Sequence, residues 1–370
     1  MKALTLVAPS TFEFGEAPNP KPSRGEVLVD VKACGICGSD LHGMDGRSGR
    51  RIPPIIMGHE AAGEIVSLGD DVTQYKVGDH VTFDSTEFCG ECPDCKAGYI
   101  NLCKNRRVLG VSCADFRRNG CFAEQVALPT HILHRLPADL PWEKAAFAEP
   151  VSIALHAVNL APKPQASTND GDEYGAVSNE DILPKLPAPA ERQECAIVVG
   201  AGLIGLLVLQ ALKARGWKKV YAVDLDDSRL ALARKLGAED VFNAKEEGLA
   251  MKLRQIGGGD GVDASFEVVG AAAPTELAIL SVRKGGTVVL VGNLQPIVPV
   301  PLQQIVTRQI TLRGSCACAG EYPEAIQRIQ DGSIQVEPLL SKVAPLSEGA
   351  EWFHKGVQPG NGLLKVVLKP

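Results

Sequence analysis

The sequence predicts an α/β protein of two domains, a β-rich domain and a doubly wound parallel sheet with helices on its faces. Over the first 150 residues, short apolar runs alternate with turns that contain Gly and Pro, which is typical of an all-β, partly barrel-like domain. From about residue 195, continuous apolar runs alternate with amphipathic segments, which indicates parallel strands joined by helices. A length of 370 residues accommodates both domains.

The individual elements follow from these patterns. Short apolar runs predict strands in the first domain at residues 26–34, 60–69, 77–83 and 122–128. Uninterrupted apolar runs predict buried strands at 196–200, 219–224, 263–270 and 287–293. Amphipathic segments between these runs predict helices at 202–216, 228–237 and 274–286. Near the C-terminus we expect a helix at 321–332 and a closing strand at 363–370.

The change of rhythm after residues 310–316 sets the expected domain boundaries. Because strand and helix no longer alternate there, we expect the tail to fold back onto the first domain. The β-rich domain then comprises residues 1–157 and 317–370, and the parallel domain comprises residues 158–316. The segment 161–194 is rich in Pro, Asp, Glu, Asn and Ser, so we expect an exposed surface excursion rather than a third domain, and we assign it no role.

The charge and hydropathy of the chain limit the kinds of partner that the protein is expected to bind. The net charge of −6 and the pI near 5.7 give no electrostatic footprint for nucleic acid or for an acidic membrane. The uncharged run 196–212 is slightly short for a membrane span and contains glycines, so we expect a buried strand that runs into a buried helix. The first residues do not have the pattern of a secretion signal. We therefore expect a cytoplasmic protein whose eleven cysteines serve metal or redox chemistry rather than disulfides.

Four cysteines form the most specific motif of the chain. They follow the spacing C-x2-C-x2-C-x7-C on a short loop that contains Gly and Pro: Cys89, Cys92, Cys95 and Cys103. Four thiolates at this spacing can close a tetrahedral Zn²⁺ shell without an open position, so the predicted site is structural. An iron–sulfur cluster or a set of idle or oxidised cysteines are the alternatives.

A second, incomplete set of metal ligands surrounds the stretch GICGSDLHG at 35–43. Cys37 offers a thiolate, and His59 in GHE offers an imidazole. A catalytic zinc needs about three protein ligands and one open position, so a third ligand is expected from Glu60 or Glu149. Cys34 is an alternative sulfur donor, but its place at the end of a predicted strand favours packing.

A glycine-rich turn at the start of the second domain predicts a dinucleotide site. The string GAGLIG contains Gly200, Gly202 and Gly205 with Leu203 and Ile204 between them, and it follows a strand and opens a helix. Such a turn lets backbone amides approach a pyrophosphate. Asp224 ends the next strand, where its carboxylate is suited to bind a ribose diol and to repel a 2′-phosphate. NAD is therefore favoured over NADP.

Taken together, the motifs GICGSDLH, GHEAAGEIVSLGDDV, VGDHV, CGECPDC…C, EPVSIALHA and GAGLIG resemble the zinc-dependent medium-chain alcohol/polyol dehydrogenases. The resemblance covers nearly the whole chain. It implies a GroES-like catalytic domain, a Rossmann cofactor domain and an active site in the cleft between them. It also implies Cys37 and His59 as catalytic-zinc ligands, with Glu60 as a ligand or as a group that exchanges with one.

The same resemblance assigns further roles. Asp40 is expected to orient His59, because imidazole ligands usually need such a partner. Ser39 and His42 match the family's proton relay. Glu149 matches the glutamate of the sorbitol-dehydrogenase-like branch. One departure concerns the arginine–aromatic pair that this branch uses to contact substrate hydroxyls, since Ala317 and Cys318 stand there, which puts sorbitol itself in doubt.

Two further groups of residues are expected near the reacting centre. Val291, Gly292 and Asn293 should lie near the nicotinamide ribose. Cys316 and Cys318 either line the same cleft or are core cysteines.

We therefore expect an NAD-dependent oxidoreductase that carries two zinc ions per chain, one catalytic and one structural. Zinc acts as a Lewis acid on a secondary alcohol or polyol, and the substrate's proton leaves through Ser39 and His42. The alternatives are a zinc- and nucleotide-binding redox sensor without turnover, or a dehydrogenase of a sugar phosphate, amino alcohol, aldose or simple alcohol. A zinc-free reductase of the same superfamily is disfavoured by the cysteine motifs.

We expect a homodimer or homotetramer, with residues 287–293 as a possible edge strand that pairs across the dimer axis.

Overall fold

The computed structural model describes residues 1–162, 194–256 and 259–370. The predicted excursion at 161–194 lies almost entirely outside the described residues. The described chain divides into two compact units, one made of Met1–Val158, Gly202–Ala214 and Ser315–Pro370 and the other of Asn159–Ala201 and Arg215–Gly314. The predicted boundaries, which keep residues 158–316 in one domain, stay a prediction.

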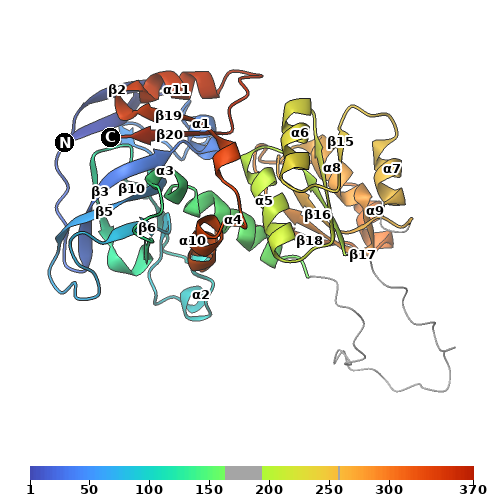
Figure 1. Cartoon of the computed structure of the whole chain (residues 1–370), viewed down its shortest axis with the longest axis horizontal. Helices are drawn as coiled ribbons and strands as arrows, with labels where there is room; N and C mark the ends of the chain where they lie inside the picture. The colour runs from blue at the N-terminus through green and yellow to red at the C-terminus, as the bar shows by residue number, and fades with distance from the viewer. Residues whose placement is uncertain (163–193, 257–258) are drawn as a thin grey trace, which may run out of the picture. The chain divides into compact units, whose positions relative to one another are not determined.

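The first unit is built on a seven-stranded sheet among its described residues, in the order β12-β6-β5-β3-β20-β19 with β11 paired to β3 (Figure 1). These strands are β3 (Glu26–Gly35), β5 (Glu60–Leu68), β6 (His80–Phe83), β11 (Gln125–Pro129), β12 (Leu133–Arg135), β19 (Leu340–Pro345) and β20 (Lys365–Lys369). The last strand pairs antiparallel with β3, where Leu368 lies opposite Cys34. The C-terminal segment therefore completes the sheet that the N-terminal segment begins.

Buried and partly buried residues alternate along β3, which shows which face of the strand packs against the core. Val27, Val29 and Val31 are buried on one side of the strand, while the residues between them are only partly buried. These valines join a core that includes Ile65 and Phe122. The smaller strands around this sheet are β1 (Lys2–Ala8), β2 (Thr11–Glu16), β4 (Ile55–Ile56), β7 (Thr86–Glu87), β8 (Arg107–Val108), β9 (Val111–Ser112) and β10 (Arg117–Arg118).

Short helices carry much of the chemistry of the first unit. They are α1 (Gly38–Gly43), α2 (Pro93–Lys96), α3 (Trp142–Ala145), α4 (Ala148–Asn159), α5 (Leu203–Ala214), α10 (Tyr322–Gln330) and α11 (Gly349–Gly356), with 3₁₀ turns η1 (Ile100–Leu102), η2 (Thr130–Ile132), η3 (Glu337–Leu339) and η4 (Leu346–Glu348). The predicted helix at 321–332 is confirmed as α10, which buries Tyr322, Ala325, Ile326 and Ile329 at helical spacing.

The second unit contains a parallel six-stranded sheet in the order β15-β14-β13-β16-β17-β18. Its strands are β13 (Cys195–Val199), β14 (Lys219–Asp224), β15 (Asp240–Asn243), β16 (Val262–Glu267), β17 (Val282–Leu290) and β18 (Thr311–Gly314), and its helices are α6 (Asp227–Lys235), α7 (Leu249–Gln255), α8 (Ala272–Ser281) and α9 (Leu302–Thr307). The strand order changes direction at β13, so the doubly wound fold class is confirmed.

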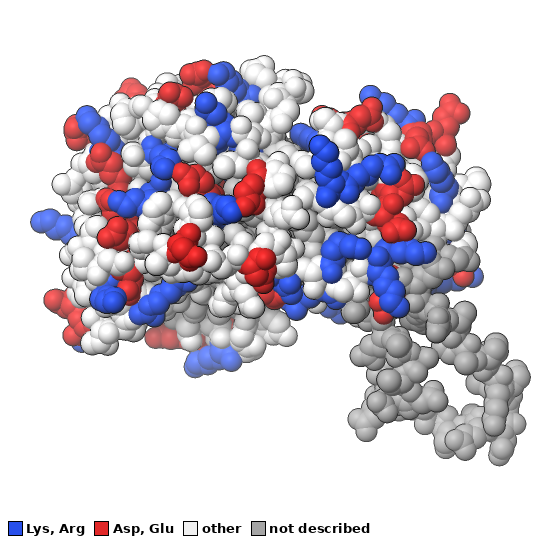
Figure 2. Space-filling view, viewed as in Figure 1, with Lys and Arg blue, Asp and Glu red and all other residues white. Residues whose placement is uncertain are grey.

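The uncharged run at 196–212 forms the fully buried strand β13 and then most of α5, as predicted. No described helix is long and apolar enough to cross a membrane. On the face drawn in Figure 2, basic and acidic side chains both occur over each unit.

Two predictions for the second unit are wrong. The helix expected at 274–286 ends at Ser281, because Val282 pairs with Val262 and begins β17. The buried guanidinium of Arg308 donates hydrogen bonds to the carbonyls of Ile279 and Val282, which satisfies this helix end. The possible edge strand at 287–293 lies inside the sheet, because β17 pairs with both β16 and β18.

Candidate functional site

A first cluster of potential metal ligands lies where two strands and a short helix meet. Ligand atoms of Cys37, His59 and Glu60 all lie within 4.8 Å of one another. Cys37 caps the N-terminus of α1, and Glu60 opens β5 opposite Gly35 of β3. Gly58 has a φ of +94°, and a Cβ there would lie 2.8 Å from the Cys34 sulfur, so only glycine leads the chain into His59 without strain. Cys34 itself is buried, as the sequence predicts.

The residue types of this cluster fit zinc. A thiolate, an imidazole and a carboxylate form the kind of three-ligand set that leaves a fourth position for a substrate. His59 is 6% exposed, and its Nδ1 has no hydrogen-bond partner among the described residues. A buried ring nitrogen without a partner is costly, and the nearby Asp40 carboxylate could accept a hydrogen bond from Nδ1 if the ring moved slightly to bind a metal through Nε2.

Asp40 lies behind the cluster. Its Oδ1 is 3.6 Å from His59 Nδ1, which is near but outside hydrogen-bond distance. The same oxygen accepts a 2.9 Å hydrogen bond from Arg51, and the other carboxylate oxygen accepts one from the Cys37 amide at 3.4 Å. Arg51 is 4% exposed and was not identified from the sequence, because nothing in its local pattern distinguishes it from a surface arginine.

A buried lysine also borders the cluster. Lys365 on β20 pairs with the Glu60 carboxylate and donates to the Ile36 carbonyl at 3.0 Å. Burial lowers the pKa of Lys365, but the charges of Glu60 and Cys37 outweigh burial and the net pKa is raised. Sequence reasoning missed this residue. The available signal was a single lysine within the otherwise apolar run LLKVVL.

Glu149 lies close to the cluster without belonging to it. It is 8% exposed near the start of α4, and its Oε1 accepts a 3.5 Å hydrogen bond from Ser85. Burial raises the pKa of Glu149 to about 7, while the neighbouring His59 opposes the rise and Glu60 adds to it. The three-residue cluster contains Glu60 and not Glu149.

The two residues expected to relay protons are both exposed on α1. The Ser39 hydroxyl donates to the Cys37 sulfur at 3.3 Å and accepts from Arg51 at 3.5 Å. Within the described structure no hydrogen bond joins Ser39 to His42. The relay therefore requires the Ser39 hydroxyl to turn away from the sulfur.

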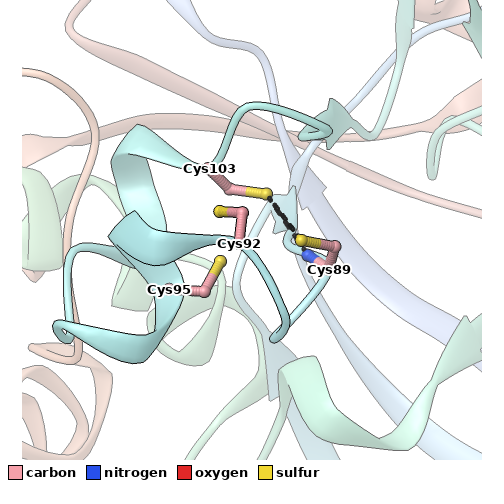
Figure 3. Close-up of side chains that lie close together, drawn as sticks. All are labelled: Cys89, Cys92, Cys95 and Cys103. Atoms are coloured by element: carbon pink, nitrogen blue, oxygen red, sulfur yellow. Dashed lines mark hydrogen bonds between the residues drawn. The ribbon is translucent and has the colours of Figure 1, made fainter.

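The four-cysteine loop forms the second cluster. Ligand atoms of Cys89, Cys92, Cys95 and Cys103 lie within 4.8 Å of one another, and Figure 3 shows the four side chains gathered in one place, with a hydrogen bond between the Cys103 and Cys89 sulfurs. The loop is closed by the β7–β8 pair. Hydrogen bonds from the amides of Glu91 and Cys92 lower the pKa of Cys89 to about 6, and that of Cys92 is also lowered, chiefly by a hydrogen bond from the Cys95 amide. Burial, by contrast, raises the pKa of Cys95 to about 12. Four cysteine sulfurs in one closed set fit a structural zinc, which would stabilise them as thiolates.

The glycine-rich turn begins at the end of β13. Gly200 has a φ of +104°, and a Cβ there would lie 2.6 Å from the Val269 side chain. A Cβ on Gly292 would collide with the Gly270 backbone, so the segment after β17 also approaches its neighbour closely. Above Gly202, by contrast, a Cβ would meet no atom within 4 Å. This open space over a backbone turn fits a bound pyrophosphate.

The carboxylate of Asp224 lies at the end of β14, as predicted. Its Oδ2 accepts a 2.6 Å hydrogen bond from the Ala201 amide, and its Oδ1 accepts one from the Asp226 amide at 3.0 Å. Asp224 therefore links the glycine-rich turn to the loop after β14. Asp226 and Asp227 follow it closely, so this end of the sheet is negatively charged.

The comparisons with known proteins agree with this geometry. Residues 23–138 match the alcohol dehydrogenase GroES-like domain, and residues 204–331 match the zinc-binding dehydrogenase domain. A sorbitol dehydrogenase of Bacillus subtilis is 30% identical and a D-arabitol-phosphate dehydrogenase of Enterococcus avium is 31% identical, each covering 100% of this chain and 97% of the relative.

Among solved structures, galactitol-1-phosphate dehydrogenase from Escherichia coli is 27% identical with a TM-score of 0.83, covering 100% of both chains. The 2R,3R-butanediol dehydrogenase from Bacillus subtilis is 28% identical with a TM-score of 0.82, covering 100% of this chain and 99% of that one.

The chain belongs to the zinc-dependent medium-chain alcohol/polyol dehydrogenase family. It is an oxidoreductase of this class, with a GroES-like domain and a Rossmann domain, so the predicted family and fold class are confirmed. A binding protein or redox sensor without turnover is set aside accordingly.

Proposed function

We propose that this enzyme oxidises a secondary alcohol or polyol with NAD⁺, using one zinc held by Cys37, His59 and Glu60. The observation that carries the proposal is the closeness of these three ligand atoms, all within 4.8 Å. When bound, zinc supplies Lewis acidity to the substrate hydroxyl, and the dinucleotide supplies the hydride acceptor. A second zinc in the four-cysteine loop has a structural role.

Glu60 is favoured over Glu149 as the third ligand, because only Glu60 lies in the three-residue cluster. Its Oε2 is engaged by Lys365, which leaves Oε1 for the metal. Glu149, buried near the start of α4, is then proposed to accept a hydrogen bond from a substrate hydroxyl.

Ser39 and His42 carry the proton outward in this proposal. The Ser39 hydroxyl turns from the Cys37 sulfur toward the alcohol and passes the proton on, and His42 delivers it to solvent. Exposure of both side chains on α1 supports this direction of transfer. An imidazole is suited to the last step, because its ring nitrogens can accept and donate a proton.

The cofactor is proposed to be NAD, bound by Gly200, Gly202, Leu203, Ile204, Gly205 and Asp224, with Val291, Gly292 and Asn293 near the nicotinamide ribose. Asp224 ends β14 beside the glycine-rich turn, and a carboxylate there is expected to repel the 2′-phosphate of NADP. Solved structures similar to this chain include a zinc-binding dehydrogenase from Sinorhizobium meliloti bound to NADP and an alcohol dehydrogenase from Escherichia coli complexed with NADH.

The substrate is proposed to be a polyol or related secondary alcohol, since the relatives are named for sorbitol, arabitol phosphate and butanediol. A galactitol-phosphate enzyme also has this fold, so phosphorylated polyols belong in the same screen. The screen offers NAD⁺ or NADP⁺ with sorbitol, xylitol, 2,3-butanediol, galactitol 1-phosphate and threonine, and NADH or NADPH formation is measured. Oxidation of none of these alcohols would contradict the proposal.

Zinc content tests the two sites separately. We expect two zinc ions per chain in wild type. Cys37→Ser should lose one zinc and reduce kcat at least about a hundredfold. Cys92→Ser should lose the other zinc and lower the melting temperature, because the loop has few apolar residues of its own. One zinc per chain in wild type would contradict the two-site assignment.

A homodimer or homotetramer is proposed as the working form. β18 is an edge strand of the described sheet, and Leu302 and Val306 on the neighbouring α9 are 66% and 68% exposed. Exposed edges and apolar side chains favour association with a second copy. Light scattering measures this state directly.

A further inference from the structure

Residues 315–321 form a segment that cannot hold its own conformation. The sequence SCACAGE offers few large apolar side chains for packing. Ala317 has a φ of +51° and Gly320 a φ of +101°, and the left-handed region costs an alanine about 1 kcal/mol or more. Hydrogen bonds from other parts of the first unit must therefore fix this segment.

One set of these bonds comes from the four-cysteine loop. Asn101, in η1 two residues before Cys103, is 4% exposed and donates to the Cys316 carbonyl at 2.7 Å. Arg106, three residues after Cys103, donates through the same Nη1 to the Asn101 carbonyl at 2.7 Å and to the Cys316 sulfur at 3.2 Å. Asn101 and Arg106, which lie before and after Cys103 in the sequence, thus both donate hydrogen bonds to Cys316.

The other end of the segment is anchored to α4. Glu321 accepts a 2.6 Å hydrogen bond from the Ala319 amide and pairs with His156 Nδ1 at 2.9 Å. His156 Nε2 lies 3.4 Å from Asn101 Nδ2, so the two anchors meet. Glu149 lies on the same helix, two turns before His156. The segment is therefore tied to the helix that carries Glu149.

Between the two anchors, Cys318 packs against the residue that precedes a contact of Glu149. It is 2% exposed, and its thiol lies 3.9 Å from Asp84 Oδ2. The residue after Asp84, Ser85, donates a 3.5 Å hydrogen bond to Glu149 Oε1, so Cys318 lies beside the segment that contacts Glu149. A shift of residues 315–321 would therefore change the packing near Glu149.

We propose that Asn101 and Arg106 are positioning residues that fix Cys316–Cys318 as a wall of the alcohol site beside Glu149. The inference rests on the proposed function for the identity of that site. It gives the four-cysteine loop a second role, because the loop then sets substrate affinity as well as local stability. Neither residue touches the reacting atoms.

The test compares Asn101→Ala and Arg106→Ala with Arg107→Ala, an exposed arginine next in sequence. Iodoacetamide labels the full-length, zinc-loaded protein for short times, and peptide mass spectrometry follows Cys316 and Cys318. Loss of one hydrogen bond should speed labelling at least about fivefold in the first two variants and leave Arg107→Ala at the wild-type rate. Unchanged labelling in both test variants would overturn the proposal.

Kinetics with sorbitol and 2,3-butanediol separate positioning from a general structural role. KM for the alcohol should rise about tenfold, while kcat stays within about twofold and the NAD⁺ dissociation constant is unchanged. Arg106→Lys keeps one of the two hydrogen bonds and should restore part of the affinity. A fall in both kcat and the melting temperature, with no change in KM, would overturn the proposal. Labelling needs no turnover, so it remains decisive if neither alcohol is oxidised.

Discussion

The ammonium group of Lys365 and the carboxylate of Glu60 form an ion pair inside the first unit, with only 2% and 1% of the side chains exposed. The pair joins the last strand of the chain to the strand that follows His59. It also neutralises a carboxylate within the proposed metal cluster. The C-terminal strand thus contributes directly to the electrostatics of a centre whose ligands all come from the first sixty residues.

Removal of the lysine should therefore destabilise the protein. In the metal-free enzyme, Lys365→Met leaves Glu60 charged and buried, and the free energy of unfolding should fall by about 3–5 kcal/mol. Urea unfolding measures this loss. The control is Lys369→Met, on the same strand, whose ion pair with Glu143 is partly exposed and should contribute less than about 1 kcal/mol. Equal effects of the two variants would contradict the prediction.

The third zinc ligand can be assigned by a matched pair of variants. Glu60→Gln should weaken zinc at the catalytic site at least about a hundredfold, because an amide is a poor replacement for a carboxylate ligand. Glu149→Gln should keep two zinc ions and mainly affect turnover. Zinc content after dialysis against a chelator distinguishes the two, and the reverse pattern would assign Glu149 as the ligand.

Cofactor choice should depend on Asp224. Asp224→Ser removes the carboxylate nearest the glycine-rich turn, so the ratio of kcat/KM for NADP⁺ to that for NAD⁺ should rise about 10–100-fold. Asp227→Ser, three residues further along the chain at the start of α6, controls for the general loss of negative charge. If wild type already has similar kcat/KM values for NADP⁺ and NAD⁺, Asp224 does not have the role assigned to it.

A buried acid gives the protein a characteristic pH dependence. Burial raises the pKa of Asp84 from 3.8 to about 6. The folded state therefore binds this proton more tightly than the unfolded state, so the contribution of Asp84 to stability falls as pH rises from about 4 to 6 and is then constant. Relative to wild type, Asp84→Asn should gain stability over this range, up to about 3 kcal/mol above pH 6.

The amide introduced by Asp84→Asn can still accept a hydrogen bond from the Thr86 amide, which lies 2.8 Å from the native carboxylate oxygen. This substitution therefore changes charge more than shape. The difference in urea unfolding between variant and wild type, measured from pH 4 to 8, checks the prediction. A difference that shrinks as pH rises would show that Asp84 is stabilised as the anion in the folded protein.

The sequence alone determined those features that depend on residues close together in the chain. The main strands of both sheets and the helix at 321–332 followed from apolar periodicity, the four-cysteine set from its spacing, and the glycine-rich turn from its place between a strand and a helix. Each is a local property, because a turn or a short loop brings its own residues together.

Tertiary structure decided the contacts that join distant segments. Nothing near Arg51 or Asp84 in the sequence indicates a buried partner, and the apolar run around Lys365 does not reveal that Glu60 is its partner. A charged residue is buried only when the fold supplies its counter-charge or hydrogen bonds. The end of α8 at Ser281 likewise depends on Arg308, more than twenty residues later. Asn101 and Arg106 meet Cys316 only after the C-terminal segment has returned to the first unit. Their roles follow from three-dimensional packing, which no local pattern encodes.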